Sequence, residues 1–308
     1  MLSIPDYFKQ NTLELHGTDK ANIWLSNLPD ILTRCARRWN LTLLPPFGNL
    51  SIHYVAPAQR ADGTMVVLKA SSPTGEFGQE ITALHLLAGP GIVRLLEVDE
   101  TQEVMLLERL EPGMILSRLV PEHDEQATSI LANVMKRLWK PVPATHPFPT
   151  VEDWANGLNQ LRPQFQGGYG PFPPRLVDEA IALFAELNIS AEKRLLLHGD
   201  LHHENILQSG TEWRVIDPKG LIGDPGYETG AMFYNPPGWL STVQNPRPLI
   251  LRRVDQLAEE LAMERARIRG WGLAQAVLSA WWSVEDRLVE PPQDVLTVAE
   301  ILASAKIW

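Results

Sequence analysis

Cysteine and long apolar runs are both scarce in this chain of 308 residues. The single cysteine, Cys35, excludes an intrachain disulfide and a zinc site built from several cysteines. It shares an apolar helical stripe with Leu28 and Ile31, so we expect a buried thiol. No apolar run approaches the ~20 residues that span a bilayer, and the first residues lack the pattern of a signal peptide. We therefore expect a soluble, cytoplasmic protein with no membrane partner.

Basic runs are missing as well. The chain has 27 Lys and Arg residues against 37 Asp and Glu residues, which gives a net charge of −10. A nucleic-acid-binding protein usually carries a cluster of basic residues that neutralises phosphates, so we expect no nucleic-acid partner. The acidic excess would suit a cationic small-molecule ligand, and it would equally suit solubility alone.

The order of predicted elements divides the chain into two regions. Residues 18–39 have a helical pattern with an expected break at Pro29, and residues 41–69 alternate like strands around an Asp62-Gly63 hairpin turn. A helix over 75–88 and two more strand-like runs follow, and after Pro112-Gly113 the chain is mainly helical. The sequence therefore predicts an α+β, two-lobed protein. We place an N-terminal lobe, an antiparallel sheet with one key helix, at 1–110 and a larger helical lobe at 111–308.

Residues 195–220, LLLHGDLHHENILQSGTEWRVIDPKG, contain the densest group of polar side chains. Two apolar strand-like runs flank a turn that carries Asp200 and Asn205, and Asp217 follows the second run. Phosphoryl transfer requires positioning and charge neutralisation more than covalent chemistry. Asp200 is suited to receive the proton of an acceptor hydroxyl, as a catalytic base. Asn205 and Asp217 offer the hard oxygen ligands that Mg²⁺ prefers.

Two other interpretations of this segment are open. The first is a hydrogen-bonded polar turn between core strands, which would explain one buried Asp or His but not the whole run. The second is a metallohydrolase site in which His198, His202 and His203 bind Zn²⁺ or Fe²⁺. The order H-x-D-x-H-H differs from the H-x-H-x-D-H arrangement of such hydrolases, and Asn205 and Asp217 would have no use. We expect His198 and His202 to brace the loop.

Lys69 and Glu80 form a second candidate site in the N-terminal region. Strand alternation places Lys69 on one face with Met65 and Val67, and helical spacing places Glu80 beside an apolar stripe. A charged group buried without a partner is costly, so the simplest arrangement is a Lys69–Glu80 ion pair. Glu76, one turn earlier, is the second possible partner.

The spacing H-x-D-x-x-x-x-N, with I-D ending 12 residues later, resembles the protein-kinase-like superfamily. More narrowly, HGDLHHENIL and IDPKGLIGDPGYE resemble the aminoglycoside phosphotransferases, in the branch of streptomycin 6-kinases and hydroxyurea-type antibiotic-resistance kinases. ADGTMVVLK, GPGIVRLLEVD and MLLERLEPG extend the resemblance over most of the chain. It implies a bilobal kinase-like fold that uses ATP and Mg²⁺ to phosphorylate a small-molecule hydroxyl. The 6-hydroxyl of streptomycin is the favoured acceptor; another metabolite or a hydroxyurea-like compound is the alternative.

The resemblance also implies nucleotide-binding positions. Lys69 would contact the ATP phosphates, and main-chain groups of Glu108 and Leu110 would bind adenine. Backbone N–H groups near a single glycine would contact phosphates, in the turn that contains Gly48, Asn49, Leu50 and Ser51. The chain departs from protein kinases because it has no G-x-G-x-x-G loop, no D-F-G and no A-P-E segment. These departures favour a small acceptor over a protein.

The acceptor pocket is predicted from charge. Streptomycin carries two guanidinium groups, so an acceptor of this kind would require carboxylates on the pocket wall. The candidates are Glu204, Asp224 and Glu228 near the polar turn, and Asp286 further along the chain. For Asp224, a role in fixing the loop is the alternative, and the tryptophans near the C-terminus are expected to be core.

Overall fold

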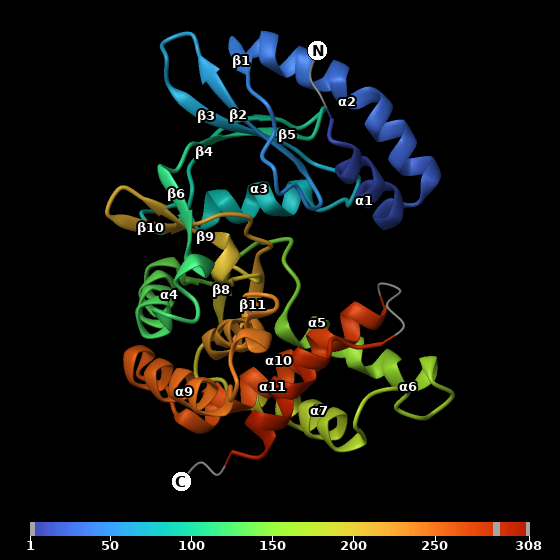
Figure 1. Ribbon diagram of the computed structural model, residues 1–308, viewed down its shortest axis with the longest axis vertical. Coiled ribbons are helices and arrows are strands. Elements are labelled where there is room, and N and C mark those ends of the chain that lie inside the picture. Colours follow the sequence, from blue (N-terminus) through green and yellow to red (C-terminus); the bar gives the residue numbers. More distant parts are fainter. Residues whose placement is uncertain (1–3, 286–289, 306–308) are drawn as a thin grey trace. The chain divides into compact units, whose positions relative to one another are not determined.

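The computed structural model describes residues 4–285 and 290–305 (Figure 1). The chain divides into two compact units. Unit 1 contains the residues up to Ala88 together with Val93–Gly113, and unit 2 contains Gly89–Ile92 together with the chain from Met114 onward. Mixed α and β structure, with an antiparallel sheet in unit 1 and most of the helices in unit 2, confirms the predicted α+β class.

Unit 1 is built on a five-stranded sheet in the order β1-β2-β3-β5-β4, and every neighbouring pair of strands is antiparallel. The predicted hairpin at Asp62-Gly63 joins β2 to β3. The strands are β1 (Leu41–Leu43), β2 (Tyr54–Arg60), β3 (Met65–Ala70), β4 (Leu95–Asp99) and β5 (Val104–Glu108).

The two faces of this sheet have different partners. Helices α1 (Asp6–His16) and α2 (Thr18–Arg38) pack on one face, where they form an apolar core with β2, β3 and β5 (Figure 1). Alternation along β3 directs Val66 and Leu68 into that core. Lys69, which follows Leu68, therefore points to the opposite face, which carries α3 (Phe77–Leu86).

Helix α2 continues through Pro29, so the expected break at this residue is wrong. Proline removes one backbone hydrogen bond, but burial of Leu28 and Leu32 against the sheet holds the helix on both sides of it. The expectation for Cys35 is confirmed. Its side chain is 1% exposed on the same face of α2, and burial raises the pKa of the thiol to about 11.

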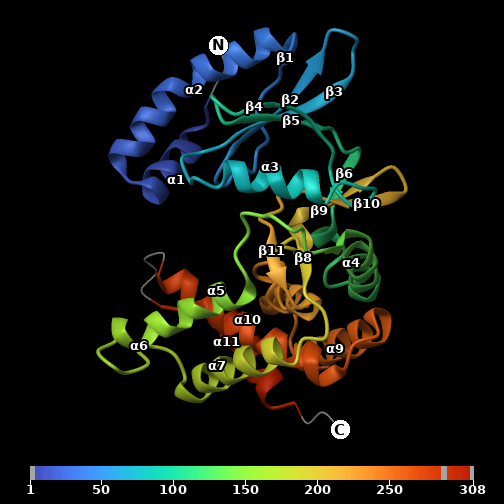
Figure 2. The ribbon, with the colours of Figure 1, turned by 180° about the vertical axis from the view of Figure 1, so that it is seen from behind.

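Unit 2 has its helices arranged around the long α10, which lies beside α7, α9 and α11 (Figure 2). Trp271 and Trp281 of α10 are buried, as the sequence predicted for this tryptophan-rich part. The helices are α4 (Asp124–Leu138), α5 (Val151–Ala155), α6 (Leu161–Gln164), α7 (Pro174–Ile189), α8 (Ala231–Tyr234), α9 (Arg247–Leu261), α10 (Arg265–Glu285) and α11 (Gln293–Ala303).

Two small three-stranded sheets flank the polar turn. One has the order β10-β9-β6 and the other β11-β8-β7. Because β8 and β9 belong to different sheets, residues 198–205 between them connect the two. The strands are β6 (Pro112–Ile115), β7 (Lys140–Pro141), β8 (Leu195–Leu197), β9 (Ile206–Ser209), β10 (Glu212–Val215) and β11 (Leu221–Gly223).

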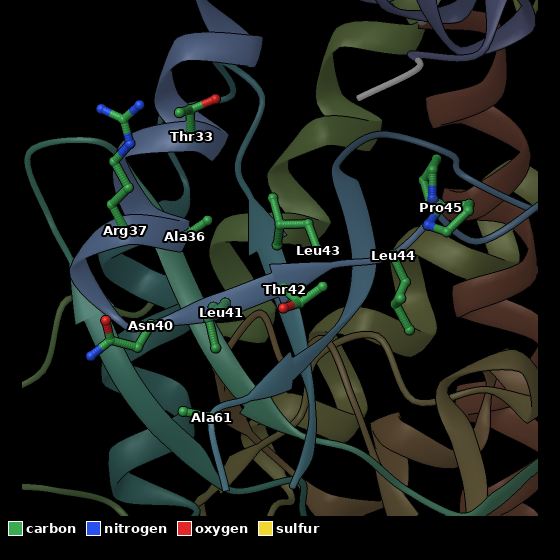
Figure 3. Close-up of a pocket in the computed structure, with 11 residues that line it drawn as sticks. Thr33, Ala36, Arg37, Asn40, Leu41, Thr42, Leu43, Leu44, Pro45 and Ala61 are labelled. Atoms are coloured by element: carbon green, nitrogen blue, oxygen red, sulfur yellow. The ribbon is translucent and has the colours of Figure 1, made fainter. Parts of the chain in front are cut away.

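A pocket of about 770 Å³ opens in unit 1 beside the end of α2, β1 and the residues that follow it (Figure 3). Its lining includes Arg37, Asn40 and Pro45, and none of the predicted site residues contributes to it. None of the helices in the described part of the chain is both long enough and apolar enough to cross a membrane.

Candidate active site

Lys69 and Glu80 form a buried ion pair in unit 1. Lys69 Nζ lies 2.6 Å from Glu80 Oε1, and the two side chains are 3% and 10% exposed. Glu76, the second possible partner, is exposed at the start of α3, where its N–H donates to the Thr74 hydroxyl. The pairing inferred from alternation and helical spacing is therefore confirmed, with Glu80 as the partner.

The turn predicted to bind phosphates lies between β1 and β2. Gly48, Asn49 and Ser51 are all exposed there, and a Cβ added at Gly48 would meet no atom within 4 Å. The N–H of Leu50 donates to the Tyr7 hydroxyl at 3.2 Å, so this amide already has a partner within unit 1. Gly48, Asn49 and Ser51 are the exposed residues of this turn.

Glu108 ends β5 and is tied to Arg94 through both its main chain and its side chain. Its N–H donates to the Arg94 carbonyl at 3.0 Å, and its carboxylate accepts from the N–H and Nε of Arg94 at 2.9 Å each. The Glu108 N–H is therefore already used within unit 1. Leu110, two residues later, is buried.

In unit 2, the 198–205 loop begins in tightly packed backbone. Gly199 has φ +85°, and a Cβ at this position would lie 3.2 Å from Leu221 and 3.3 Å from Trp154. Both the positive φ and the lack of space explain why this position is a glycine. Strand β8 thus delivers the next residue, Asp200, on a backbone that has little freedom to shift.

His198 is a fully buried brace for this loop. Its Nε2 lies 2.8 Å from the Ile216 carbonyl, and its Nδ1 accepts from the Asp200 N–H at 3.2 Å. These two bonds assign the proton to Nε2. Burial lowers the pKa of His198 to about 4, so the ring is neutral near pH 7. The bracing role that we expected is confirmed.

Asn205 is tied to Asp200 by its side chain and to the residue before Asp217 by its backbone. The Asn205 amide nitrogen donates to the Asp200 carbonyl at 2.8 Å, and the Ile216 N–H donates to the Asn205 carbonyl at 3.0 Å. The next residue, Asp217, has φ +59°. Residues other than glycine seldom adopt this conformation, and such residues concentrate at functional sites. The amide oxygen of Asn205 and the carboxylate of Asp217 are the candidate oxygen ligands for a cation at this site.

Asp200 itself is only partly buried and lies between the side chains of Lys219 and His202. Its Oδ2 lies 3.6 Å from Lys219 Nζ, and its Oδ1 lies 3.7 Å from His202 Nε2. The side chains of Asp200 and Lys219 are 38% and 47% exposed. The backbone of Asp200 is therefore held on both sides, and its carboxylate is open to a ligand from solvent.

Glu228, a candidate acceptor contact, is instead buried beneath the loop. Its two oxygens accept from the Gly199 N–H at 3.0 Å and from the Trp139 indole N–H at 2.7 Å. Burial raises the pKa of Glu228 to about 7, although these hydrogen bonds favour the charged form. Contacts to the protein occupy both carboxylate oxygens, which favours a role in holding the 198–205 loop.

Asp224 is also committed to the protein. It caps a short 3-10 helix by accepting from the Gly226 N–H at 2.7 Å, and it forms an ion pair with Arg267 of α10. These bonds agree with the alternative prediction for Asp224, a role in fixing the loop. Glu204 is exposed in the loop, and Asp286 lies outside the described residues.

The three histidines do not form a metal centre. His198 uses both ring nitrogens as described, His202 Nδ1 accepts from the Glu204 N–H, and His203 is fully buried. Over residues 4–285 and 290–305, no three His, Cys, Asp or Glu side chains are grouped so that they could hold a metal ion. The geometry thus gives no support to the metallohydrolase interpretation.

Three residues of this site had no role in the sequence analysis: Trp139, Trp154 and Lys219. The two tryptophans contact the loop from segments at least 40 residues away, and no local pattern reveals such contacts. Lys219 lies within the DPKG motif, two residues after a predicted metal ligand, so a signal was present. The role of Lys219 could not be predicted from this motif, because it depends on the turn that directs the lysine side chain to Asp200.

Comparison with known proteins places this geometry in a family. The family described as aminoglycoside/hydroxyurea antibiotic resistance kinase matches residues 45–287. A streptomycin 6-kinase of Streptomyces griseus is 32% identical over 291 residues, 93% of each chain. A hydroxyurea phosphotransferase of Kitasatospora aureofaciens is 34% identical over 294 residues, 93% of this chain and 82% of that protein.

Among solved structures, an aminoglycoside phosphotransferase in a ternary complex with ADP and hygromycin B has the same fold. Its TM-score is 0.62 at 16% identity, over 88% of this chain and 96% of that one. Fold, loop geometry and a family match over most of the sequence therefore agree, and the chain belongs to the aminoglycoside/hydroxyurea antibiotic resistance kinases.

Proposed function

We propose that this kinase transfers the γ-phosphoryl group of ATP to the 6-hydroxyl of streptomycin and so inactivates the antibiotic. The observation that carries the proposal is the arrangement of Asp200, Asn205 and Asp217 within residues 198–217 of unit 2. There the Asn205 side chain donates to the main-chain carbonyl of Asp200, whose own carboxylate is partly exposed. The Asn205 carbonyl accepts from the N–H of Ile216, the residue before Asp217. The similarity to the streptomycin 6-kinase of Streptomyces griseus supports the acceptor.

The donor set suits Mg²⁺. Because the Asn205 nitrogen is used by the Asp200 carbonyl, its oxygen is the atom that remains to bind a cation, and Asp217 adds a carboxylate. Mg²⁺ needs few protein ligands when nucleotide phosphates and water complete its octahedron. When bound, it would neutralise charge on the phosphates. In unit 1, Lys69 would contact the ATP phosphates, with Glu80 as its fixed partner.

Asp200 is the residue proposed to act on the acceptor. As the acceptor oxygen attacks the γ-phosphorus, the bond between that phosphorus and the leaving ADP oxygen breaks, and the hydroxyl proton passes to Asp200. His198, Asn205 and Glu228 hold the backbone on both sides of Asp200 and so set the direction of its carboxylate. These three residues position Asp200, and none of them needs to touch the acceptor.

A hydroxyurea-like compound is the second candidate acceptor. The observation that favours it is the 34% identity to the hydroxyurea phosphotransferase of Kitasatospora aureofaciens. The same residues would perform the transfer, because the chemistry at phosphorus does not depend on the acceptor. The two candidates differ only in the part of the pocket that recognises the rest of the molecule.

The proposal is tested by incubating the protein with γ-labelled ATP, Mg²⁺ and each of streptomycin, other aminoglycosides and hydroxyurea. Mass spectrometry should find one added phosphoryl group on streptomycin, and phosphorus–proton correlation by NMR should place it on the 6-hydroxyl. An Asp200→Asn variant is the control for contaminating kinases. Transfer to hydroxyurea alone would favour the second candidate, and labelled streptomycin that carries phosphate at another hydroxyl would contradict the assigned position.

A further inference from the structure

Lys219 is a cation at the proposed reaction centre that the mechanism above does not use. Its ammonium nitrogen lies 3.6 Å from Asp200 Oδ2, so it faces the carboxylate that is proposed to receive the proton. The two residues are 19 positions apart in sequence, and they meet because the 217–220 turn folds back onto the 198–205 loop. Its place beside the reacting groups calls for a function.

The backbone of Lys219 is anchored on the same loop as Asp200. The N–H groups of Lys219 and Gly220 both donate to the His198 carbonyl, at 2.9 Å each. A Cβ built at Gly199 would lie 3.4 Å from the Cβ of Lys219, so the two backbones are in close contact. Gly220 has φ +73°, and a Cβ there would overlap Phe148. The origin of the lysine side chain is therefore fixed relative to Asp200.

The ion pair that joins the two side chains is loose. A separation of 3.6 Å is longer than a hydrogen bond between an ammonium and a carboxylate, and both side chains are more than a third exposed. Pairs of this kind contribute little to folding stability. The ammonium of Lys219 is thus accessible to a second anion while it stays near Asp200.

Asp200 needs a nearby positive charge when a phosphoryl group arrives. The transferring group spreads negative charge over three oxygens, and a carboxylate close to it repels that charge. A cation placed between the two anions removes this repulsion and stabilises charge that develops during transfer. Lys219 has the charge, the reach and the fixed origin for this position, and its side chain is open to solvent.

We propose that Lys219 is a further catalytic residue whose ammonium group binds an oxygen of the phosphoryl group during its transfer. Lys219 keeps its proton throughout. The acceptor oxygen forms the new bond to phosphorus, the bond to ADP breaks, and Asp200 receives the hydroxyl proton. The inference rests on the proposed phosphotransfer, but it does not depend on which hydroxyl is the acceptor.

The first test compares Lys219→Met and Lys219→Arg with Lys193→Met, a matched control at an exposed lysine on the surface of unit 2. In Lys219→Met, kcat should fall by about 100-fold or more while KM for both substrates stays within about 3-fold. Arginine keeps the charge, so Lys219→Arg should recover about 10-fold of the loss. A Lys219→Met variant with wild-type kcat, or one altered in KM alone, would overturn the inference.

The second test measures binding without turnover. Calorimetry with ADP and Mg²⁺, with and without aluminium fluoride, compares the ground state with a mimic of the transferring phosphoryl group. Lys219→Met should bind ADP within about 3-fold of wild type but lose about 30-fold or more of the extra affinity that the fluoride provides. Equal losses in both titrations, or no loss in either, would refute the role. Because no acceptor is present, this result stands even if wild type fails to phosphorylate streptomycin, which would overturn the proposed acceptor alone.

Discussion

The two units each contain a lysine paired with a carboxylate, and the two pairs differ in almost every physical respect. Lys69 and Glu80 are 2.6 Å apart and nearly excluded from solvent, whereas Lys219 and Asp200 are 3.6 Å apart and widely exposed. A buried pair is rigid, because removal of either partner leaves an uncompensated charge in a medium that solvates it poorly. An exposed pair can exchange partners at little cost. An ammonium and a carboxylate thus form a rigid pair in unit 1 and a pair that can exchange partners in unit 2.

The largest effect is expected where the exposed pair loses its carboxylate. Asp200→Asn retains size and the backbone bonds of the loop, but an amide cannot receive the acceptor proton at neutral pH. Turnover should fall by about 1,000-fold or more, since positioning remains and base catalysis is lost. Steady-state kinetics with the acceptor, together with ADP titration to show that binding is retained, provide the measurement. Activity within about 10-fold of wild type would remove Asp200 as the base.

Breaking the buried pair should lower the stability of the fold, in addition to any effect on nucleotide binding. Lys69→Met removes the positive charge beside the buried Glu80, and we expect a loss of about 3–5 kcal/mol in the free energy of unfolding. Chemical denaturation of the variant at neutral pH measures this loss. The matched control is Lys69→Met combined with Glu80→Gln, which removes the stranded charge and should recover part of it. A loss below about 1 kcal/mol would mean that Glu80 is stabilised by other groups.

Glu228 offers a pH-dependent test of the buried carboxylates. Its pKa is about 7 in the folded protein against an ordinary value of 4.5, so the folded state binds the proton more tightly than the unfolded state. This raised pKa contributes stability that is greatest at low pH and is lost as pH rises from 4.5 to 7. The stability of wild type relative to Glu228→Gln should therefore fall by about 2 kcal/mol between about pH 5 and pH 8.

Urea unfolding of both proteins at the two pH values measures that difference. Comparison with the variant cancels the opposite contribution of His198, whose lowered pKa removes stability as pH falls below 6.5. A difference that stays constant with pH would show that Glu228 titrates alike in the folded and unfolded states.

The smallest effect completes the comparison. Lys219→Met should change the free energy of unfolding by less than about 1 kcal/mol, because the pair that it breaks is exposed and loose. The exposed Lys193→Met provides the baseline in the same denaturation experiment. A loss as large as that of Lys69→Met would erase the distinction between the two pairs and would make Lys219 a structural residue.

Much of unit 1 could be predicted from local patterns. Alternation along β3 places Lys69 opposite Val66 and Leu68, and helical spacing in α3 places Glu80 on its buried side, so the ion pair follows from periodicity and the cost of buried charge. Pro29 shows where such reasoning fails. The intrinsic preference of proline predicts a break, and the packing of the surrounding helix against the sheet prevents it.

The site in unit 2 could be predicted only in part. The spacing of Asp200, Asn205 and Asp217 is a sequence pattern, and it identified residues that the structure brings together. The contact of Glu228 with Gly199 and Trp139 could not be predicted, because it joins three segments that are distant in sequence. Charge alone suggested a substrate contact for Glu228, whereas burial and hydrogen bonding favour an internal one.

The burial of Cys35 has a practical consequence. Its thiol is 1% exposed and its pKa is about 11, so thiol-directed dyes should leave it unmodified in the native protein at neutral pH. It is also the only cysteine of the sequence. A cysteine introduced at the exposed Glu204 would then be the one labelled position, without any change to the native thiol. A fluorophore there would report, in real time, the arrival of ligands at the loop that carries Asp200.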